Sequence, residues 1–122
     1  NYWQAMCAVT KAGVLKCWGN NNDSMLGDGT TTDRTAPVAI DVGTNYTQVA
    51  MGETHGCGLT TAGTIKCWGL NDAYQIGDGT TTTRSTPVVV DSGTQYIAVF
   101  ANKRTSCGIT TTNALKCWGS QW

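Results

Sequence analysis

The chain has 122 residues, 40% of them hydrophobic, and its eight Lys and Arg balance its eight Asp and Glu. That length is enough for one compact domain with its own core. The zero net charge argues against a nucleic-acid-binding surface and a polybasic membrane anchor, and no apolar run approaches the roughly 20 residues of a membrane-spanning helix. Abundant Thr and Gly favour strands joined by tight turns.

The first two predicted strands form a hairpin near the start of the chain. They are Met6–Thr10 and Val14–Trp18, and Gly13 marks the turn between them. The segment from Gly19 to Gly29 is rich in Gly, Asn and Asp, so we expect a long connecting loop there.

Two further strands are predicted before residue 52. The first is Val38–Ile40, which follows Pro37; proline suits the start of a strand because it has no N–H to donate. Gly43 marks the next turn, and Tyr46–Met51 is the last strand of this set.

The chain then repeats itself with a period of fifty residues. "LGDGTTT" at Leu26–Thr32 returns as "IGDGTTT" at Ile76–Thr82, and "DVGTNYTQV" at Asp41–Val49 returns as "DSGTQYIAV" at Asp91–Val99. We therefore divide a single repeat array, residues 1–122, into repeat 1 (1–50), repeat 2 (51–100) and a partial repeat 3 (101–122). Four strands in a repeat of this length are typical of an all-β propeller blade, whereas a solenoid of stacked hairpins is the alternative.

The six cysteines recur with the same period, ten residues apart within each hairpin. A three-residue loop ending at Gly13 places that glycine in the left-handed position, and Gly63 and Asn113 stand there in the other copies. This register sets the two cysteines of each hairpin opposite one another at a non-hydrogen-bonded position, where Cα atoms lie about 4.5 Å apart. The predicted disulfides are Cys7–Cys17, Cys57–Cys67 and Cys107–Cys117.

Other roles for the cysteines are buried free thiols or a zinc site. The only histidine is His55, so zinc would need ligands from elsewhere in the chain. Persistent disulfides imply an oxidising compartment, which predicts an extracellular or cell-surface location, or a periplasm.

A tryptophan follows the second cysteine of every hairpin. Trp18, Trp68 and Trp118 therefore point to the opposite face from the sulfur atoms. We expect them to pack between neighbouring blades, because both faces of a blade are covered by its neighbours. Stacking against a sugar is the alternative interpretation.

Two long segments carry a family resemblance. "GETHGCGLTTAGTIKCWG" (Gly52–Gly69) and "GDGTTTTRSTPVVV" (Gly77–Val90) resemble the repeats of the regulator of chromosome condensation family, a seven-bladed propeller. The resemblance covers the whole chain, and the paired cysteines look like those of exported bacterial members. The founding member binds chromatin in the nucleus, a role that the neutral charge and the paired cysteines do not favour here. A secreted propeller that inhibits a β-lactamase is another relative, so the resemblance is compatible with a protein-binding surface.

The repeats are not identical, and they are fewer than seven. His55 is replaced by Ala5 and Thr105 in the other copies, and the loop "NNNDSM" (Asn20–Met25) differs from "LNDAYQ" (Leu70–Gln75). Two and a half repeats do not close a seven-bladed ring, so we expect the blade faces to bind further blades of a longer chain or copies of this chain, in a ring or a filament.

No catalytic constellation or cofactor motif is recognised. We expect His55 to have a core or capping role, and Asp28 and Asp78 to close turns through backbone N–H groups; a weak calcium site with Asp23 and Asp28 is the alternative. The chain also holds candidate N-glycosylation triplets at Asn22 and Asn45.

The sequence therefore predicts an all-β array of tandem four-stranded antiparallel blades with disulfide-stapled hairpins. The expected function is a non-enzymatic extracellular structural module that self-associates or forms part of a larger propeller. A protein- or glycan-binding module, such as an inhibitor, adhesin or lectin, is the second hypothesis. We expect no cofactor, no metal, no nucleic-acid partner and no membrane insertion.

Overall fold

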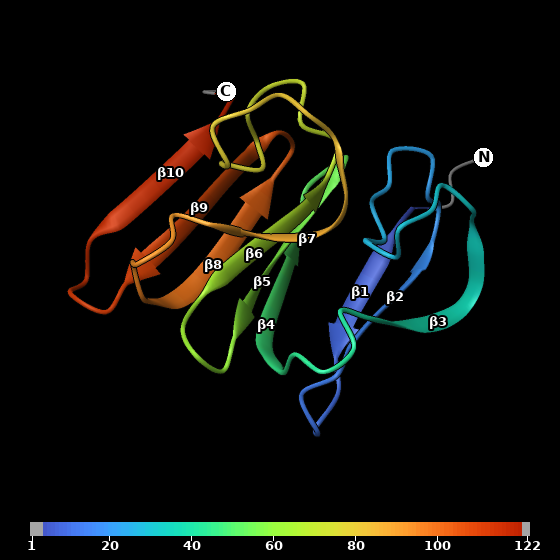
Figure 1. Cartoon of the computed structure of the whole chain (residues 1–122), viewed down its shortest axis with the longest axis horizontal. Coiled ribbons are helices and arrows are strands. Elements are labelled where there is room, and N and C mark those ends of the chain that lie inside the picture. The colour runs from blue at the N-terminus through green and yellow to red at the C-terminus, as the bar shows by residue number, and fades with distance from the viewer. Residues whose placement is uncertain (1–3, 121–122) are drawn as a thin grey trace.

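The computed structural model describes residues 4–120. They fold into three antiparallel sheets that follow one another in chain order (Figure 1). We call these sheets blade 1, blade 2 and blade 3. Blade 1 contains β1 (Met6–Val9), β2 (Leu15–Gly19) and β3 (Arg34–Ile40). Blade 2 contains β4 (Tyr46–Met51), β5 (His55–Thr60), β6 (Ile65–Gly69) and β7 (Arg84–Val90). Blade 3 contains β8 (Tyr96–Asn102), β9 (Thr105–Thr110) and β10 (Leu115–Gly119).

Each blade is built around a tight hairpin whose register matches the prediction. Cys7 lies opposite Cys17, Cys57 opposite Cys67, and Cys107 opposite Cys117. The three disulfides are formed, with Cα–Cα distances of 4.0, 4.0 and 4.1 Å. The third loop residue is left-handed in every hairpin, with φ of 87° at Gly13, 85° at Gly63 and 67° at Asn113. The all-β, disulfide-stapled fold is therefore confirmed.

One strand begins earlier than predicted. We expected Val38–Ile40, but β3 spans Arg34–Ile40 and contains Pro37 in its interior. Pro37 is tolerated because β3 pairs only with β2 and lies at the edge of its sheet, and because the register shifts between Cys17 and Gly19, beside the proline.

The sheets divide at a different phase from the sequence repeats. Blade 2 runs from residue 46 to residue 90, so the chain crosses between blades in the turns at 41–45 and 91–95. Those turns contain the left-handed residues Asp41 and Asp91, with φ of 53° and 50°. The repeat boundaries at 50/51 and 100/101 thus describe the period, whereas the turns set the limits of each sheet.

The hydrophobic core lies between the blades. One cluster joins blade 1 to blade 2, and its largest members are Leu15, Leu26, Ile40, Tyr46 and Trp68. The second joins blade 2 to blade 3, and its largest members are Leu59, Ile65, Ile76, Val90 and Tyr96. Apolar side chains on both faces of blade 2 are therefore buried, as in a propeller. None of the described residues forms a helix with the length and hydropathy of a membrane span.

The third disulfide provides a test of the hairpin staple with little disturbance of packing, because Cys117 is exposed and Cys107 is half-buried. We expect Cys107→Ala/Cys117→Ala to lower the free energy of unfolding by about 2–3 kcal/mol, since the bridge closes a short loop in the unfolded chain. Urea denaturation followed by tryptophan fluorescence measures this loss. An unchanged midpoint would contradict it.

Candidate interaction surface

A buried asparagine organises the long loop that follows each of the first two hairpins. The Asn21 side-chain NH2 donates to the carbonyl oxygens of Thr30 and Thr32 at 2.9 and 3.0 Å, and its Oδ1 accepts from the Leu26 N–H at 3.0 Å. Asn71 makes the corresponding bonds in blade 2, to Thr80, Thr82 and Ile76. The loop therefore has a fixed shape, on which the exposed Asn22 and the half-buried Asp23 are presented.

An aspartate and an arginine close the base of the same loop. Asp28 accepts the Thr30 N–H at 3.0 Å, as predicted for a turn-closing aspartate, and its other oxygen accepts from Arg34 Nε at 2.8 Å. Burial raises the pKa of Asp28, but the hydrogen bonds from Thr30 and Arg34 outweigh it and hold that pKa below its usual value. Asp78 and Arg84 repeat the pair at 2.6 Å. Since an arginine forms an ion pair with each of these carboxylates, the structure gives no support to the calcium alternative at Asp28.

The tryptophans at the ends of the second and third hairpins contact the loop of the preceding blade. Trp68 is fully buried, and its indole N–H donates to the Met25 carbonyl oxygen at 2.8 Å. Trp118 donates in the same way to the Ile76 carbonyl oxygen at 3.1 Å. Trp18 stands at the equivalent position of blade 1 and is half-buried. The burial of Trp68 leaves none of its surface for stacking on a sugar.

The single histidine lies between blades 2 and 3. His55 is fully buried, with Nε2 2.8 Å from the Ser106 hydroxyl oxygen. The Ser106 hydroxyl donates to the Gln75 carbonyl oxygen at 2.7 Å, so His55 Nε2 supplies the proton of the bond to Ser106. Burial lowers the pKa of His55 to about 4. His55 is therefore a neutral component of the interface between the blades.

The turns between blades carry a second repeated contact. The Asp41 carboxylate accepts from the Tyr46 hydroxyl at 2.7 Å and from Lys66 Nζ at 2.9 Å. Burial raises the pKa of Asp41, but the bonds from Lys66 and Tyr46 outweigh it and lower that pKa below its usual value. In the next turn Asp91 accepts from Tyr96 and from Lys116. Each turn is thus fixed to the blade that follows it.

A groove opens on the loop side of the interface between blades 1 and 2. Its volume is about 430 Å³, and we call it the loop groove. The residues that line it are Gln4, the blade 1 loop residues Asn20, Asn22, Asp23 and Met25, and the turn residues Glu53 and Thr54 between β4 and β5. A smaller space of about 260 Å³ shares Gln4, Met25 and Glu53 and extends to Asn102 and Lys103. The groove therefore combines exposed polar groups with an apolar wall at Met25.

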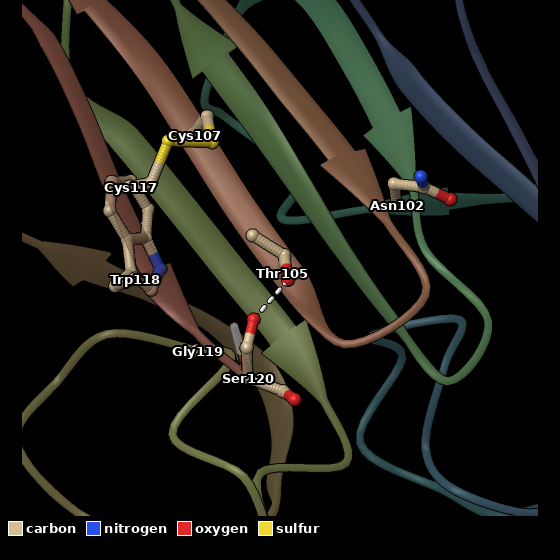
Figure 2. Close-up of a pocket in the computed structure, with 7 residues that line it drawn as sticks. All are labelled: Asn102, Thr105, Cys107, Cys117, Trp118, Gly119 and Ser120. Atoms are coloured by element: carbon tan, nitrogen blue, oxygen red, sulfur yellow. Dashed lines mark hydrogen bonds between the residues drawn. A yellow bond between two sulfur atoms is a disulfide. The ribbon is translucent and has the colours of Figure 1, made fainter. Parts of the chain in front are cut away.

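A second open surface lies on blade 3. A pocket of about 430 Å³ lies beside the Cys107–Cys117 disulfide. Figure 2 shows the residues that line it, among them Thr105, whose hydroxyl donates to the Ser120 carbonyl oxygen. Thr105 holds the position of His55, which in blade 2 contacts the following blade. This pocket therefore lies on the kind of blade face that packs against another blade.

Comparison with known families identifies the repeat. Two sequence models of the regulator of chromosome condensation (RCC1) repeat match residues 13–59 and 46–75, which together cover just over half of the 122 residues. The chain belongs to the RCC1 repeat family. A search of curated protein sequences gives no match.

Solved structures support the fold. Human WBSCR16 aligns with a TM-score of 0.87 and 19% identity, over 95% of this chain and 31% of its own. Prp20p from Saccharomyces cerevisiae aligns at 0.83 and 19%, over 98% and 33%. The CRINKLY WD40 ectodomain of the Arabidopsis thaliana receptor kinase ACR4 aligns at 0.60 and 16%, over 96% and 34%. The chain thus spans about a third of the length of each structure, and at these identities the likeness concerns the fold alone.

The two glycosylation triplets lie on different surfaces of the RCC1 repeats. Asn22 is exposed in the loop groove, but Ser24 of the same triplet is buried. Asn45 and Thr47 are both exposed at the turn into β4, where the Asn45 carbonyl oxygen accepts from the Thr61 N–H at 3.0 Å. Modification at either asparagine stays a prediction.

Sequence reasoning missed several residues of these interfaces. Asn21 and Arg34 of the loop, and Lys66 of the turn contact, were not singled out, although each has a chemically identical residue fifty positions away. That recurrence is the signal that identifies them. Ser106 has no such signal, because Gly56 and Met6 occupy its place in the other RCC1 repeats.

The histidine predicts a pH dependence of stability. Its pKa is about 4 in the folded chain and about 6.5 when unfolded, so the unfolded state binds more protons between those values. The stability contributed by neutral His55 is complete above about pH 6.5 and is lost as the pH falls toward 4. We expect the free energy of unfolding to drop by about 2 kcal/mol between pH 7 and pH 5.

Urea denaturation at the two pH values measures this drop. His55→Gln retains a donor at the site and does not titrate, so its free energy of unfolding should change little over the same range. The shifted aspartates titrate below this range, because their pKa values are lowered from 3.8. The explanation fails if the wild type and the variant show the same pH dependence.

The tryptophan contact gives a second prediction, on glycine. Gly27 and Gly79 are both left-handed, with φ of 72° and 82°, but a Cβ at Gly27 would lie 2.9 Å from the Trp68 ring whereas one at Gly79 meets nothing within 4 Å. Gly79→Ala should cost about 1–2 kcal/mol for the backbone alone. Gly27→Ala should cost a further 1–3 kcal/mol or so, because Trp68 has to move. Equal losses in urea denaturation would show that the close approach of Trp68 is not important.

Proposed function

We propose that this chain is a non-enzymatic, protein-binding module of an RCC1-type propeller that works outside the cell or in a periplasm. The observation that carries the proposal is the construction of the blades. Their faces recognise one another through repeated contacts such as Trp68 to the Met25 carbonyl oxygen, while their loops are held rigid by Asn21 and Asn71. A rigid scaffold with differing loops is suited to binding a partner.

Relatives support protein binding as the activity. The yeast structures are described as RCC1 (Prp20) bound to Kap60, and as Prp20p with its binding properties to Gsp1p and histones. Kap60, Gsp1p and histones are partners of the yeast proteins, and this chain aligns with only about a third of the length of those proteins. The shared propeller architecture nevertheless favours binding over catalysis for this chain.

The disulfides and one group of structural relatives support an extracellular or periplasmic location. All six cysteines are paired within their hairpins, and such bonds persist where thiols are not kept reduced. Ectodomains of the plant receptor kinases ACR4 and CR4 share the fold.

The blade faces are the proposed assembly surfaces. Phe100 and Leu115 of blade 3 are 49% and 67% exposed, and Met6 of blade 1 is 50% exposed. Apolar side chains on the same kind of surface are buried where blades meet within this chain. We propose that these faces pack against further blades, supplied by a longer propeller or by another copy of this chain.

Light scattering after size-exclusion chromatography tests self-association. We expect a mass above that of one chain at high concentration, and a single-chain mass for Leu115→Asp, which places a charge on the blade 3 face. Val42→Asp is the matched control, because Val42 is 84% exposed in the turn between blades. A single-chain mass at every concentration contradicts self-association and leaves the longer propeller as the source of further blades.

The compartment has an independent test. Non-reducing mass spectrometry of the protein from its natural source should find the three hairpin disulfides intact. Six alkylatable thiols would contradict the extracellular assignment.

A further inference from the structure

The loop groove carries two carboxylates that form no ion pair with any residue of the described segment. The ion pairs among residues 4–120 involve five other acidic residues, Asp28, Asp41, Asp72, Asp78 and Asp91. Asp23 and Glu53 take part in none of them, and both line the groove. Because they come from different blades, the fold itself places them around one space.

The next interface shows what occupies the same place when a cation is available within the chain. Fifty residues on, Glu53 and Thr54 become Lys103 and Arg104, and Asn22 becomes Asp72. There the Arg104 guanidinium lies 3.5 Å from the Asp72 carboxylate and bridges blades 3 and 2. At the first interface Thr54 is too short to reach across, and both charged groups of the groove are acidic.

The remaining walls of the groove suit a long cationic side chain. Asn20 and Asn22 contribute side-chain amides, and Met25 contributes an apolar wall against which the methylene groups of such a side chain pack. The Thr54 hydroxyl oxygen is buried and has no hydrogen-bond partner among residues 4–120. Within that same segment no three His, Cys, Asp or Glu side chains form a metal-type cluster, so the donor set fits an organic cation better than a metal ion.

We infer that the loop groove between blades 1 and 2 binds an arginine side chain of a protein partner, in the place that Arg104 fills at the next interface. Asp23 and Glu53 supply the two carboxylates and Met25 the apolar contact. This inference rests on the proposed protein-binding function and names the groove through which it acts.

Nuclear magnetic resonance of the ¹⁵N-labelled chain tests the groove with a defined probe. We expect the peptide acetyl-Gly-Arg-Gly-amide to shift the backbone amide signals of Asn22, Glu53 and Thr54. The analogue with citrulline, which has the shape of arginine without its charge, should leave them in place. Binding should weaken as salt is added, because the carboxylates are accessible to solvent.

Two carboxylate variants locate the binding site. Asp23→Asn/Glu53→Gln keeps the size of both side chains, and it should weaken binding of the arginine peptide roughly three- to tenfold. Asp33→Asn is the matched control: Asp33 is an exposed carboxylate outside the groove, it also forms no ion pair in the described segment, and the new amide oxygen can still accept the Asn21 N–H that Asp33 accepts at 2.8 Å. It should bind as the wild type does.

A variant that introduces an arginine tests whether the loop groove corresponds to the site of Arg104 at the second interface. Thr54→Arg places in the groove the residue found at position 104, so it should abolish binding of the peptide, whereas Thr81→Arg on the exposed loop before β7 should not. Equal binding by the citrulline peptide, by Asp23→Asn/Glu53→Gln or by Thr54→Arg overturns the inference. The proposed function is judged separately, by the mass of the assembly and by the state of the cysteines.

Discussion

The structure depends on one recurring contact, in which the tryptophan of one blade lies against a glycine in the loop of the blade before it. Trp68 packs on Gly27 and donates to the Met25 carbonyl oxygen, and Trp118 repeats this with Gly77 and Ile76. The indole ring buries a large apolar area, and its N–H satisfies a carbonyl oxygen that burial would otherwise leave unpaired. Each blade is therefore stabilised by its neighbour. The contact recurs because Gly27 and Gly77, and likewise Trp68 and Trp118, are fifty residues apart.

The disulfides stabilise single blades, whereas the tryptophan contact joins neighbouring blades. All three disulfides lie within single hairpins, so they restrict each blade and join no blade to another. Cohesion between blades rests on burial of apolar side chains, on Trp68 and Trp118, and on the Asp41–Tyr46–Lys66 contact with its repeat. Oxidising conditions thus stabilise the unit that is repeated, while non-covalent contacts determine how the units assemble.

Differences between the two interfaces carry the functional information. The second has His55 against Ser106, where the first has Ala5 and Gly56. The second closes its loop side with Arg104, where the first leaves a groove lined by Asp23 and Glu53. Because the strands beside both interfaces pair in equivalent registers, these substitutions change the surface without changing the fold.

The sequence by itself determined the local structure: the hairpins, the left-handed residue that ends each hairpin loop and the cysteine pairs. These follow from side-chain alternation and turn geometry, which act over about ten residues. Only the tertiary structure decided that His55 contacts Ser106, that Trp68 reaches Met25 and that Asp23 and Glu53 share one groove. Each of these pairs is about thirty to fifty residues apart and comes from different blades, so it depends on how the blades pack, which no local pattern specifies.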